Sequence, residues 1–466
     1  MAGVNASSAN EPHRGPQDGQ SSPGGMIATK GGFRWVVIFL LFYITVANYI
    51  DRSAIAYAIG GIKSELGLGS TEIGLILGAF GLGYAVTTFL GGIAVDRWGA
   101  RTVLLVAAIL WTASIGVTGF AAGFLTLYIA RTVLGVAEGP NFPALTGAVG
   151  HWLAPHERAI ALGNTLAAVP LALAIGAPVS TQLIHMFGWR GMFFALTVLS
   201  GVWVPLWLIF FRDHPAQSTF VGDAELKHIR GGVEAHRDRT PGHVRHGFTD
   251  WRLLLTNRTL LANYWAFFVF GYFLFFFMTW LPNYLTQTYH LNVREVGLFA
   301  ILPWACAAVL LVVLGYLSDY LLVRTGKLRL SRSTLIGVTQ LLAALAVIPI
   351  AYTHSLPVAI GCITVAVAFS MGANASYYAV NVDIVPNRAA TALGIMDTGF
   401  AISGFLAPAI TGWVVGAFGG SFEYAFLLMA GLALSSVLVV LIFHRPDEDR
   451  ADLPQGDHPA LHAAAD

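Results

Sequence analysis

Charged residues are scarce in this chain of 466 residues. Asp, Glu, Lys and Arg together make up 11% of it, whereas 56% is hydrophobic and the mean hydropathy is +0.67. Soluble domains carry about 25% charged residues, so this composition excludes an ordinary soluble protein and favours many membrane-spanning helices. The net charge of +1 says little, because membrane topology depends on where Lys and Arg lie in short loops.

Cysteine is nearly absent as well. The two that occur, Cys306 and Cys362, each lie inside an apolar stretch, so we expect packing residues rather than a disulfide framework or a metal site. The sequence also has no GxxxxGK[ST] phosphate loop, no HExxH pair and no GxSxG elbow. These absences argue against ATP-driven transport and against enzyme chemistry, and we expect no cofactor.

Long apolar segments are abundant. Twelve of them are long enough to cross about 30 Å of hydrocarbon as helices, and they divide six and six around a polar interval. The twelve segments are 33–60, 71–95, 102–120, 123–150, 158–185, 191–211, 259–287, 295–323, 333–353, 356–383, 389–416 and 421–443. The sequence therefore predicts an all-α membrane protein with two six-helix bundles.

We expect five regions along the chain. They are an N-terminal tail at 1–32, a bundle at 33–211, a linker at 212–258, a second bundle at 259–444 and a C-terminal tail at 445–466. The first tail is rich in Gly, Ser, Pro and Asn, which is typical of disorder. The first apolar segment is too long for the apolar region of a signal peptide, so we interpret it as a membrane span.

Lys and Arg are distributed unevenly between the two sets of loops. If both termini are cytoplasmic, the outward loops keep only Lys63, Arg190 and Arg294, and the other basic residues outside the spans face inward. This bias predicts cytoplasmic termini and a multi-pass protein of the cell inner (plasma) membrane.

Four charged residues lie inside apolar segments. Asp51 and Arg52 are adjacent in the first segment, and Arg131 and Glu138 are two helical turns apart in the fourth, with Gly135 between them on the same face. A charge at membrane depth costs at least ~3 kcal/mol, so such residues usually handle ions or charged substrates. A purely structural ion-pair network is the alternative. Gly135 would leave room for a ligand or for the first helix.

Two loops repeat the same order of residue types. The motif GGIAVDRWGAR follows the second segment, and GYLSDYLLVRTGK follows the eighth. We expect these loops to latch neighbouring helices in one state of the protein, although short positive-inside loops would explain the arginines alone. The residues in question are Gly92, Asp96, Arg97, Gly99 and Arg101 in the first loop and Gly315, Asp319, Arg324, Gly326 and Lys327 in the second.

These loops, together with RTVLGVAEGPNFPA on the fourth segment, resemble the major facilitator superfamily. NYIDR in the first segment and HWLAPHERA after the fourth resemble its anion:cation symporter branch, which includes permeases for sugar acids and other organic anions. The resemblance covers residues 33–445. It implies that Asp51 and Glu138 take up the driving protons and that Arg52 and Arg131 hold these acids or bind the substrate, with Arg131 the first candidate for contact.

Further polar and aromatic residues could line the same site. For each alone, a hydrogen bond between helices is at least as good an explanation, and Trp280 could belong to an interfacial belt. The candidates are Tyr49, Tyr84, Asn141, Asn164, Tyr272, Trp280, Tyr377, Tyr378 and Asn381.

Two positions depart from the sugar-acid permeases of this branch. Val169 stands where those proteins carry glutamine, which argues against a polyhydroxy substrate, and Asp397 stands where they tend to carry asparagine. Asp397 could be a third proton site, a group that pairs with a cation on the substrate, or a partner for an arginine across the interface.

The function that these features favour is proton-coupled uptake of a small organic anion by a monomer. A sugar acid and an aromatic or other carboxylate are the candidate substrates, and sodium is an alternative to protons. A uniporter or exporter of organic anions and a non-transporting sensor on the same scaffold are the other possibilities.

Overall fold

The computed structural model describes residues 32–237, 250–385 and 388–451. Within these ranges the chain is helical and contains no strand. The first bundle is formed by α1 (Phe33–Leu66), α2 (Ser70–Gly119), α3 (Phe124–Glu138), α4 (Asn141–Trp152) and α5 (Pro155–Phe210).

Two of these helices are too long to be single membrane spans. α2 has 50 residues and α5 has 56, which correspond to about 75 Å and 84 Å of helix at 1.5 Å per residue. Each is interrupted by one glycine in the left-handed region, Gly99 with φ 79° and Gly188 with φ 70°. L-residues with a side chain avoid this region, so glycine is required where the chain reverses. The bundle therefore has six spans: α1, two in α2, α3 with α4, and two in α5.

The second bundle also has six spans, but more of them are broken into two helices. Its six spans are α8 (Arg258–Tyr289), α9 (Val293–Phe299) with α10 (Ile301–Thr325), η2 (Arg329–Ser333) with α11 (Thr334–Tyr352), α12 (Leu356–Gly372) with α13 (Asn374–Ile384), α14 (Ala389–Ala417) and α15 (Glu423–Phe443). Ten helices of the described chain are long and apolar enough to cross a membrane; this number counts α5 once and omits the broken span α3–α4. Adding those two crossings gives the twelve that the sequence predicts.

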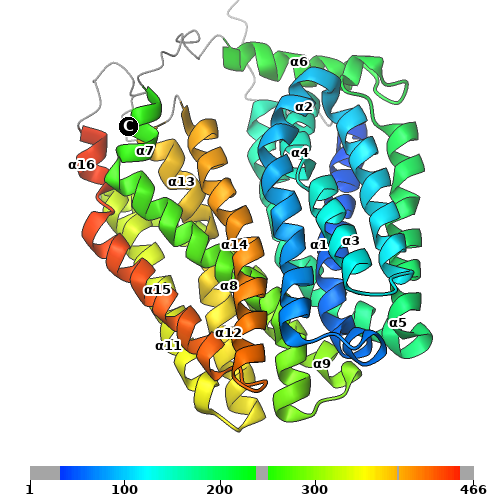
Figure 1. Ribbon diagram of the computed structural model, residues 1–466. Helices are drawn as coiled ribbons and strands as arrows, with labels where there is room; N and C mark the ends of the chain where they lie inside the picture. Colours follow the sequence, from blue (N-terminus) through cyan, green and yellow to red (C-terminus); the bar gives the residue numbers. More distant parts are fainter. Residues whose placement is uncertain (1–31, 238–249, 386–387, 452–466) are drawn as a thin grey trace, which may run out of the picture.

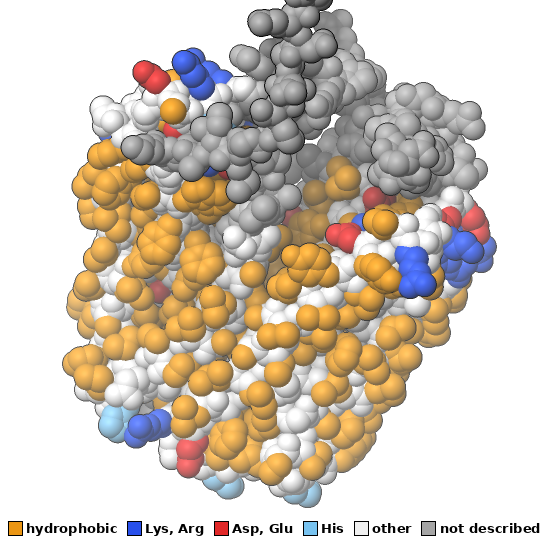
Figure 2. Space-filling model, turned by 180° about the vertical axis from the view of Figure 1, so that it is seen from behind, with side chains coloured by type: hydrophobic (Ala, Val, Ile, Leu, Met, Phe, Trp, Pro, Cys, Tyr) orange, Lys and Arg blue, Asp and Glu red, His pale blue; other side chains and the backbone are white. Residues whose placement is uncertain are grey.

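Short helices lie at one end of the molecule. They are η1 (Pro215–Gln217), α6 (Asp223–Arg237), α7 (Asp250–Thr256) and α16 (Pro446–Ala451). Figure 1 shows the bundles side by side, with α6 across the top of the first and α9 at the opposite end. We call the end with α6 and α7 the linker end and the end with α9 the far end. In Figure 2 hydrophobic side chains cover the sides of both bundles, while charged side chains gather toward the two ends.

The two bundles meet closely at the far end. A Cβ added to Gly74, near the start of α2, would lie 2.8 Å from the Cα of Gly412 in α14, and one on Gly78 would lie 2.7 Å from the carbonyl oxygen of Phe405. Helix backbones approach this closely only where side chains are missing. Gly297 of α9 meets Thr181 of α5 at the same end.

Candidate functional site

The four charged residues of the first bundle come together in its interior. Arg52 and Glu138 form an ion pair of 3.0 Å, although 86 residues separate them. Arg131 donates a hydrogen bond of 3.3 Å to the carbonyl oxygen of Arg52. None of Asp51, Arg52, Arg131 and Glu138 exposes more than 2% of its surface. The two positive and two negative groups balance formally, and we call these four residues the charged cluster.

Arg52 is held on several sides. Its Nε and Nη2 donate to one oxygen of Glu138 at 3.2 and 3.0 Å, and Nη2 also donates to Asn48 Oδ1 at 3.1 Å. Nη1 has no hydrogen-bond partner among the described residues. Three aromatic rings surround the guanidinium, with centroids 4.5, 4.4 and 5.0 Å away: Tyr49, Phe80 and Tyr84. Such cation–π contacts stabilise a buried cation, so the site holds Arg52 in place while leaving donor capacity for a ligand.

Asp51 points away from Arg52, because consecutive residues on a helix project about 100° apart. Its Oδ2 accepts a hydrogen bond of 2.5 Å from Ser200 in the second span of α5. Its other oxygen has no hydrogen-bond partner in the described part of the chain. Arg131 interacts electrostatically with both Asp51 and Glu138. The cluster thus contains two acids on different sides of α1, with Arg131 acting on both.

Gly135 has a different neighbour from the predicted ones. A Cβ there would collide with the carbonyl oxygen of Phe80 and would lie 2.8 Å from the amide nitrogen of Tyr84, both in α2. The expectation that Gly135 leaves room for a ligand or for the first helix was wrong. It allows α2 to approach α3, and this approach brings Phe80 and Tyr84 against Arg52.

In the second bundle Asp397 and Tyr378 are neighbours. The Tyr378 hydroxyl donates to Asp397 Oδ1 at 3.4 Å, and both side chains are partly exposed. Asp397 also interacts electrostatically with Tyr49 and Tyr84 of the first bundle. Asp397 therefore lies across the bundle interface from the aromatic rings that surround Arg52.

Other predicted residues of the second bundle are engaged in packing. Tyr377 is fully buried and its hydroxyl accepts a hydrogen bond of 2.7 Å from Gln340, while Asn381 donates to the carbonyl oxygen of Tyr377 at 2.9 Å. Tyr272 is buried against Thr411. Trp280 is fully buried and donates to the carbonyl oxygen of Pro408 at 3.2 Å, so a place in an interfacial belt is wrong for it.

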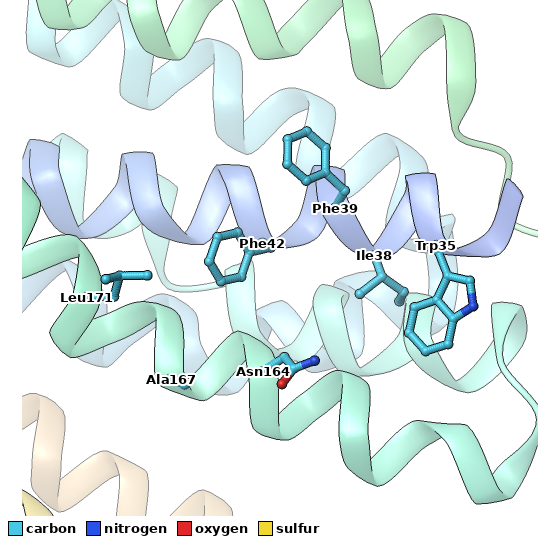
Figure 3. A pocket seen from close by; sticks show the side chains of 7 residues that line it. All are labelled: Trp35, Ile38, Phe39, Phe42, Asn164, Ala167 and Leu171. Carbon is cyan, nitrogen blue, oxygen red and sulfur yellow. The ribbon is translucent and has the colours of Figure 1, made fainter. Parts of the chain in front are cut away.

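The two asparagines of the first bundle have different surroundings. Asn141 follows the break between α3 and α4, is 1% exposed, and has no hydrogen-bond partner for either side-chain polar atom within the described ranges. Asn164 is exposed and lines an apolar groove of about 370 Å³ between α1 and α5 (Figure 3). The other lining residues are Trp35, Ile38, Phe39, Phe42, Ala167 and Leu171.

This groove is separate from the charged cluster. Phe42 precedes Arg52 by ten residues on α1, or about 15 Å along the helix. The α5 residue that lies level with the cluster is Gly176, whose added Cβ would lie 3.1 Å from Ile50. Asn164 therefore lies away from the charged residues, and the expectation that it lines the same site is wrong.

The first repeated loop is organised by a residue that the motif does not contain. Asp213, just after α5, accepts a hydrogen bond of 2.8 Å from the backbone amide of Arg101 and leaves no space for a side chain at Gly99. The side chains of Asp96 and Arg97 are exposed, and neither forms an ion pair within the described structure. Gly92 has no neighbouring atom that a Cβ would meet.

The second loop is held by ion pairs instead. Arg332 of η2 binds Asp319 at 2.9 Å and Asp383 of α13 at 3.2 Å. Arg324 donates to the Tyr320 hydroxyl at 2.8 Å. Arg332 and Asp213 could have been suspected only as charged residues close to the ends of apolar segments.

Comparison with known proteins identifies the family. A model of the Major Facilitator Superfamily matches residues 41–330 and 284–464. The hexuronate transporter of Bacillus subtilis is 32% identical over 88% of this chain and 94% of its own length. The chloroplastic ascorbate transporter of Arabidopsis thaliana is 28% identical over 88% of this chain and 74% of its own length.

Solved structures share the fold at lower identity. A bacterial homolog of the human lysosomal transporter Spinster, in inward-facing occupied and unoccupied conformations, superposes with TM-scores of 0.69 and 0.67 at 18% identity. These matches cover 92% and 90% of this chain and 99% and 96% of the homolog. From the family match and the relatives we conclude that this chain belongs to the major facilitator superfamily and is a multi-pass membrane transporter rather than an enzyme.

Proposed function

We propose that the protein is a proton-coupled symporter that takes up a small organic anion by alternating access of its two bundles. The observation that carries the proposal is the buried pair between Arg52 and Glu138, which joins a potential anion-binding group to a potential proton acceptor. The names of the relatives, transporters of hexuronate and ascorbate, support an anionic substrate.

Charge balance supports the coupling. With both acids ionised, the charged cluster is formally neutral, and entry of one carboxylate would leave an uncompensated negative charge in a medium of low dielectric constant. Protonation of Glu138 removes that charge and frees the guanidinium of Arg52 for the substrate. A planar guanidinium pairs with a carboxylate through two parallel hydrogen bonds, which suits it to this exchange of partners.

The two arginines have different parts in this proposal. Arg52 is surrounded by Tyr49 and Tyr84, which lie opposite Asp397 of the other bundle, so it is the better candidate for direct contact with the anion. Arg131 binds the backbone of α1 and interacts with both acids, so we assign it to holding the cluster. Asp51, with Ser200, is the second proton candidate.

The closed far end fits one state of the cycle. With both termini in the cytoplasm, the contact between α2 and α14 would lie on the outer side and close it in the described conformation. We place the protein in the inner (plasma) membrane as a monomer, with the repeated loops acting at the cytoplasmic side when it closes.

The test is uptake into proteoliposomes with an imposed proton gradient, using a panel of hexonates, hexuronates, aromatic acids and short carboxylates. Glu138→Gln should abolish concentrative uptake and keep counterflow exchange, because a glutamine cannot carry the proton but leaves the site filled. Glu423→Gln, at the start of α15 and remote from the cluster, is the matched control. Uptake that is driven by sodium or unaffected by Glu138→Gln would contradict proton coupling through this residue.

A further inference from the structure

Asp397 is an acid without a cation. It forms no ion pair among the described residues, and its one hydrogen bond comes from the hydroxyl of Tyr378. It lies about two turns inside α14, in a chain that has few charged residues within its spans. Arg52 of the other bundle is already paired with Glu138. The explanation that Asp397 serves an arginine across the interface thus has no contact to support it.

Aromatic rings stand beside this carboxylate. Phe400 lies one turn after Asp397 on α14, and the ring of Phe267 lies 5.6 Å from that of Tyr378 and 5.4 Å from that of Phe400. Asp397, Tyr378 and Phe400 are all partly exposed. A carboxylate beside exposed aromatic faces is the arrangement that binds ammonium groups, through ion pairing and cation–π attraction.

The same site faces the anion-binding side of the first bundle. Tyr49 and Tyr84 contact the Arg52 guanidinium and also interact electrostatically with Asp397. Tyr49 and Tyr84 are thus the residues that interact with both the cationic and the anionic group. The charged cluster together with Asp397 carries a formal charge of −1, so a simple carboxylate would add to an existing excess of negative charge.

We propose that the substrate is an amphoteric carboxylate, whose carboxylate binds Arg52 and whose ammonium group binds Asp397 between Tyr378 and Phe400. This inference rests on the proposed organic-anion transport and narrows its substrate class. Val169 is consistent with it, because an apolar residue there offers no amide to the hydroxyls of a sugar acid.

Isosteric pairs of probes test the ammonium group alone. 4-(Trimethylammonio)butanoate and 5,5-dimethylhexanoate differ only in a nitrogen cation against a carbon, as do trimethylammonioacetate and 3,3-dimethylbutanoate. Wild-type protein should transport one or both ammonium compounds with a kcat/KM at least about tenfold above that of the isostere. A preference of this size is expected from a desolvated ion pair together with a cation–π contact. Asp397→Asn should remove this preference and retain or improve transport of the carbon isostere.

The other outcomes separate the hypotheses. The inference is overturned if the wild type transports the carbon isosteres equally well or better. It is also overturned if the wild type transports other anions of the panel but neither ammonium compound. Both outcomes leave the proposed function standing. Loss of concentrative uptake of every substrate in Asp397→Asn, with exchange kept, assigns Asp397 to proton coupling and also overturns it. Absence of any anion transport by the wild type overturns both the proposed function and this inference. Phe400→Leu should weaken only the transport of the ammonium compounds. Glu423→Gln should change neither their transport nor that of the carbon isosteres.

Discussion

The interiors of the two bundles differ in chemistry. The first bundle buries four charges, of which Arg52 and Glu138 form an ion pair. The second bundle has rings and amides, such as Tyr377 with Gln340, and one partly exposed acid, Asp397. Buried ions are stable only beside a partner that compensates them. A pair shared between two bundles that move apart would be broken in each transport cycle, which is a physical reason to keep an ion pair inside one bundle.

The largest effect should come from breaking the ion pair of the first bundle. Arg52→Met leaves Glu138 buried without its partner and should destabilise the protein by about 3–5 kcal/mol as well as abolish transport. The matched change in the second bundle, Gln340→Leu, removes one neutral hydrogen bond to Tyr377 and should cost about 1–3 kcal/mol. Thermal unfolding in detergent measures both.

A double variant sharpens that comparison. Arg52→Met with Glu138→Leu removes both charges and should recover most of the lost stability without recovering transport. If Arg52→Met alone unfolds at the wild-type temperature, the cluster does not depend on internal pairing.

An intermediate effect should come from the contact that joins the bundles. A Cβ at Gly412 would lie 2.6 Å from the Cα of Gly74, so Gly412→Val should keep the far end from closing and should block transport while each bundle stays folded. Ala409 lies in this contact, with its Cβ 3.5 Å from a Cβ added to Gly78, and is only partly exposed. A cysteine at Ala409, in a background without Cys306 and Cys362, should then react faster with a polar maleimide from the far side. Gly431→Val, at a glycine with no neighbour within 4 Å, is the control; unchanged labelling in Gly412→Val would contradict the role of this contact.

The effect that is smallest at neutral pH is acid sensitivity at the linker end, where the second bundle contains a neutral buried histidine. Burial lowers the pKa of His444 from 6.5 to about 4, and the ring nitrogen Nδ1 lies 2.6 Å from Ser333 Oγ. The unfolded chain takes up this proton first, so the stabilising contribution is complete above pH 6.5 and is lost as the pH falls toward 4. His444→Asn should flatten the stability profile in that window, as measured by unfolding temperature against pH.

The first bundle uses a carboxylate at the same end. Burial acts to raise the pKa of Glu157, but the hydrogen bond and charge of Arg34 outweigh it, and the pKa lies below its usual value, with His228 adding to the lowering. The contribution of Glu157 is therefore present above the usual carboxyl pKa of 4.5 and is lost only as the pH falls below that value. A His444→Asn profile that still falls between pH 6.5 and 4 would place the sensitivity elsewhere.

Much of the fold could be predicted because hydrophobicity and glycine act locally. The apolar segments predicted all twelve spans, and the charges inside them predicted which residues would gather in the first bundle. The spans contain few charged residues, so an ion in their apolar interior has very few possible partners. The ion pair of Arg52 with Glu138 follows from this scarcity.

The amino-acid sequence alone thus specifies which residues must be buried and which charges must be compensated, because both depend on each residue's own transfer free energy. Which partner each one meets was decided by the tertiary structure. Ser200 donates a hydrogen bond to Asp51 although 149 residues separate them, Trp280 is bound to α14, and Asn164 lies away from the cluster. These partners follow from the depth and rotation of each helix, which are set by packing against its neighbours. No local pattern in the chain encodes those two quantities.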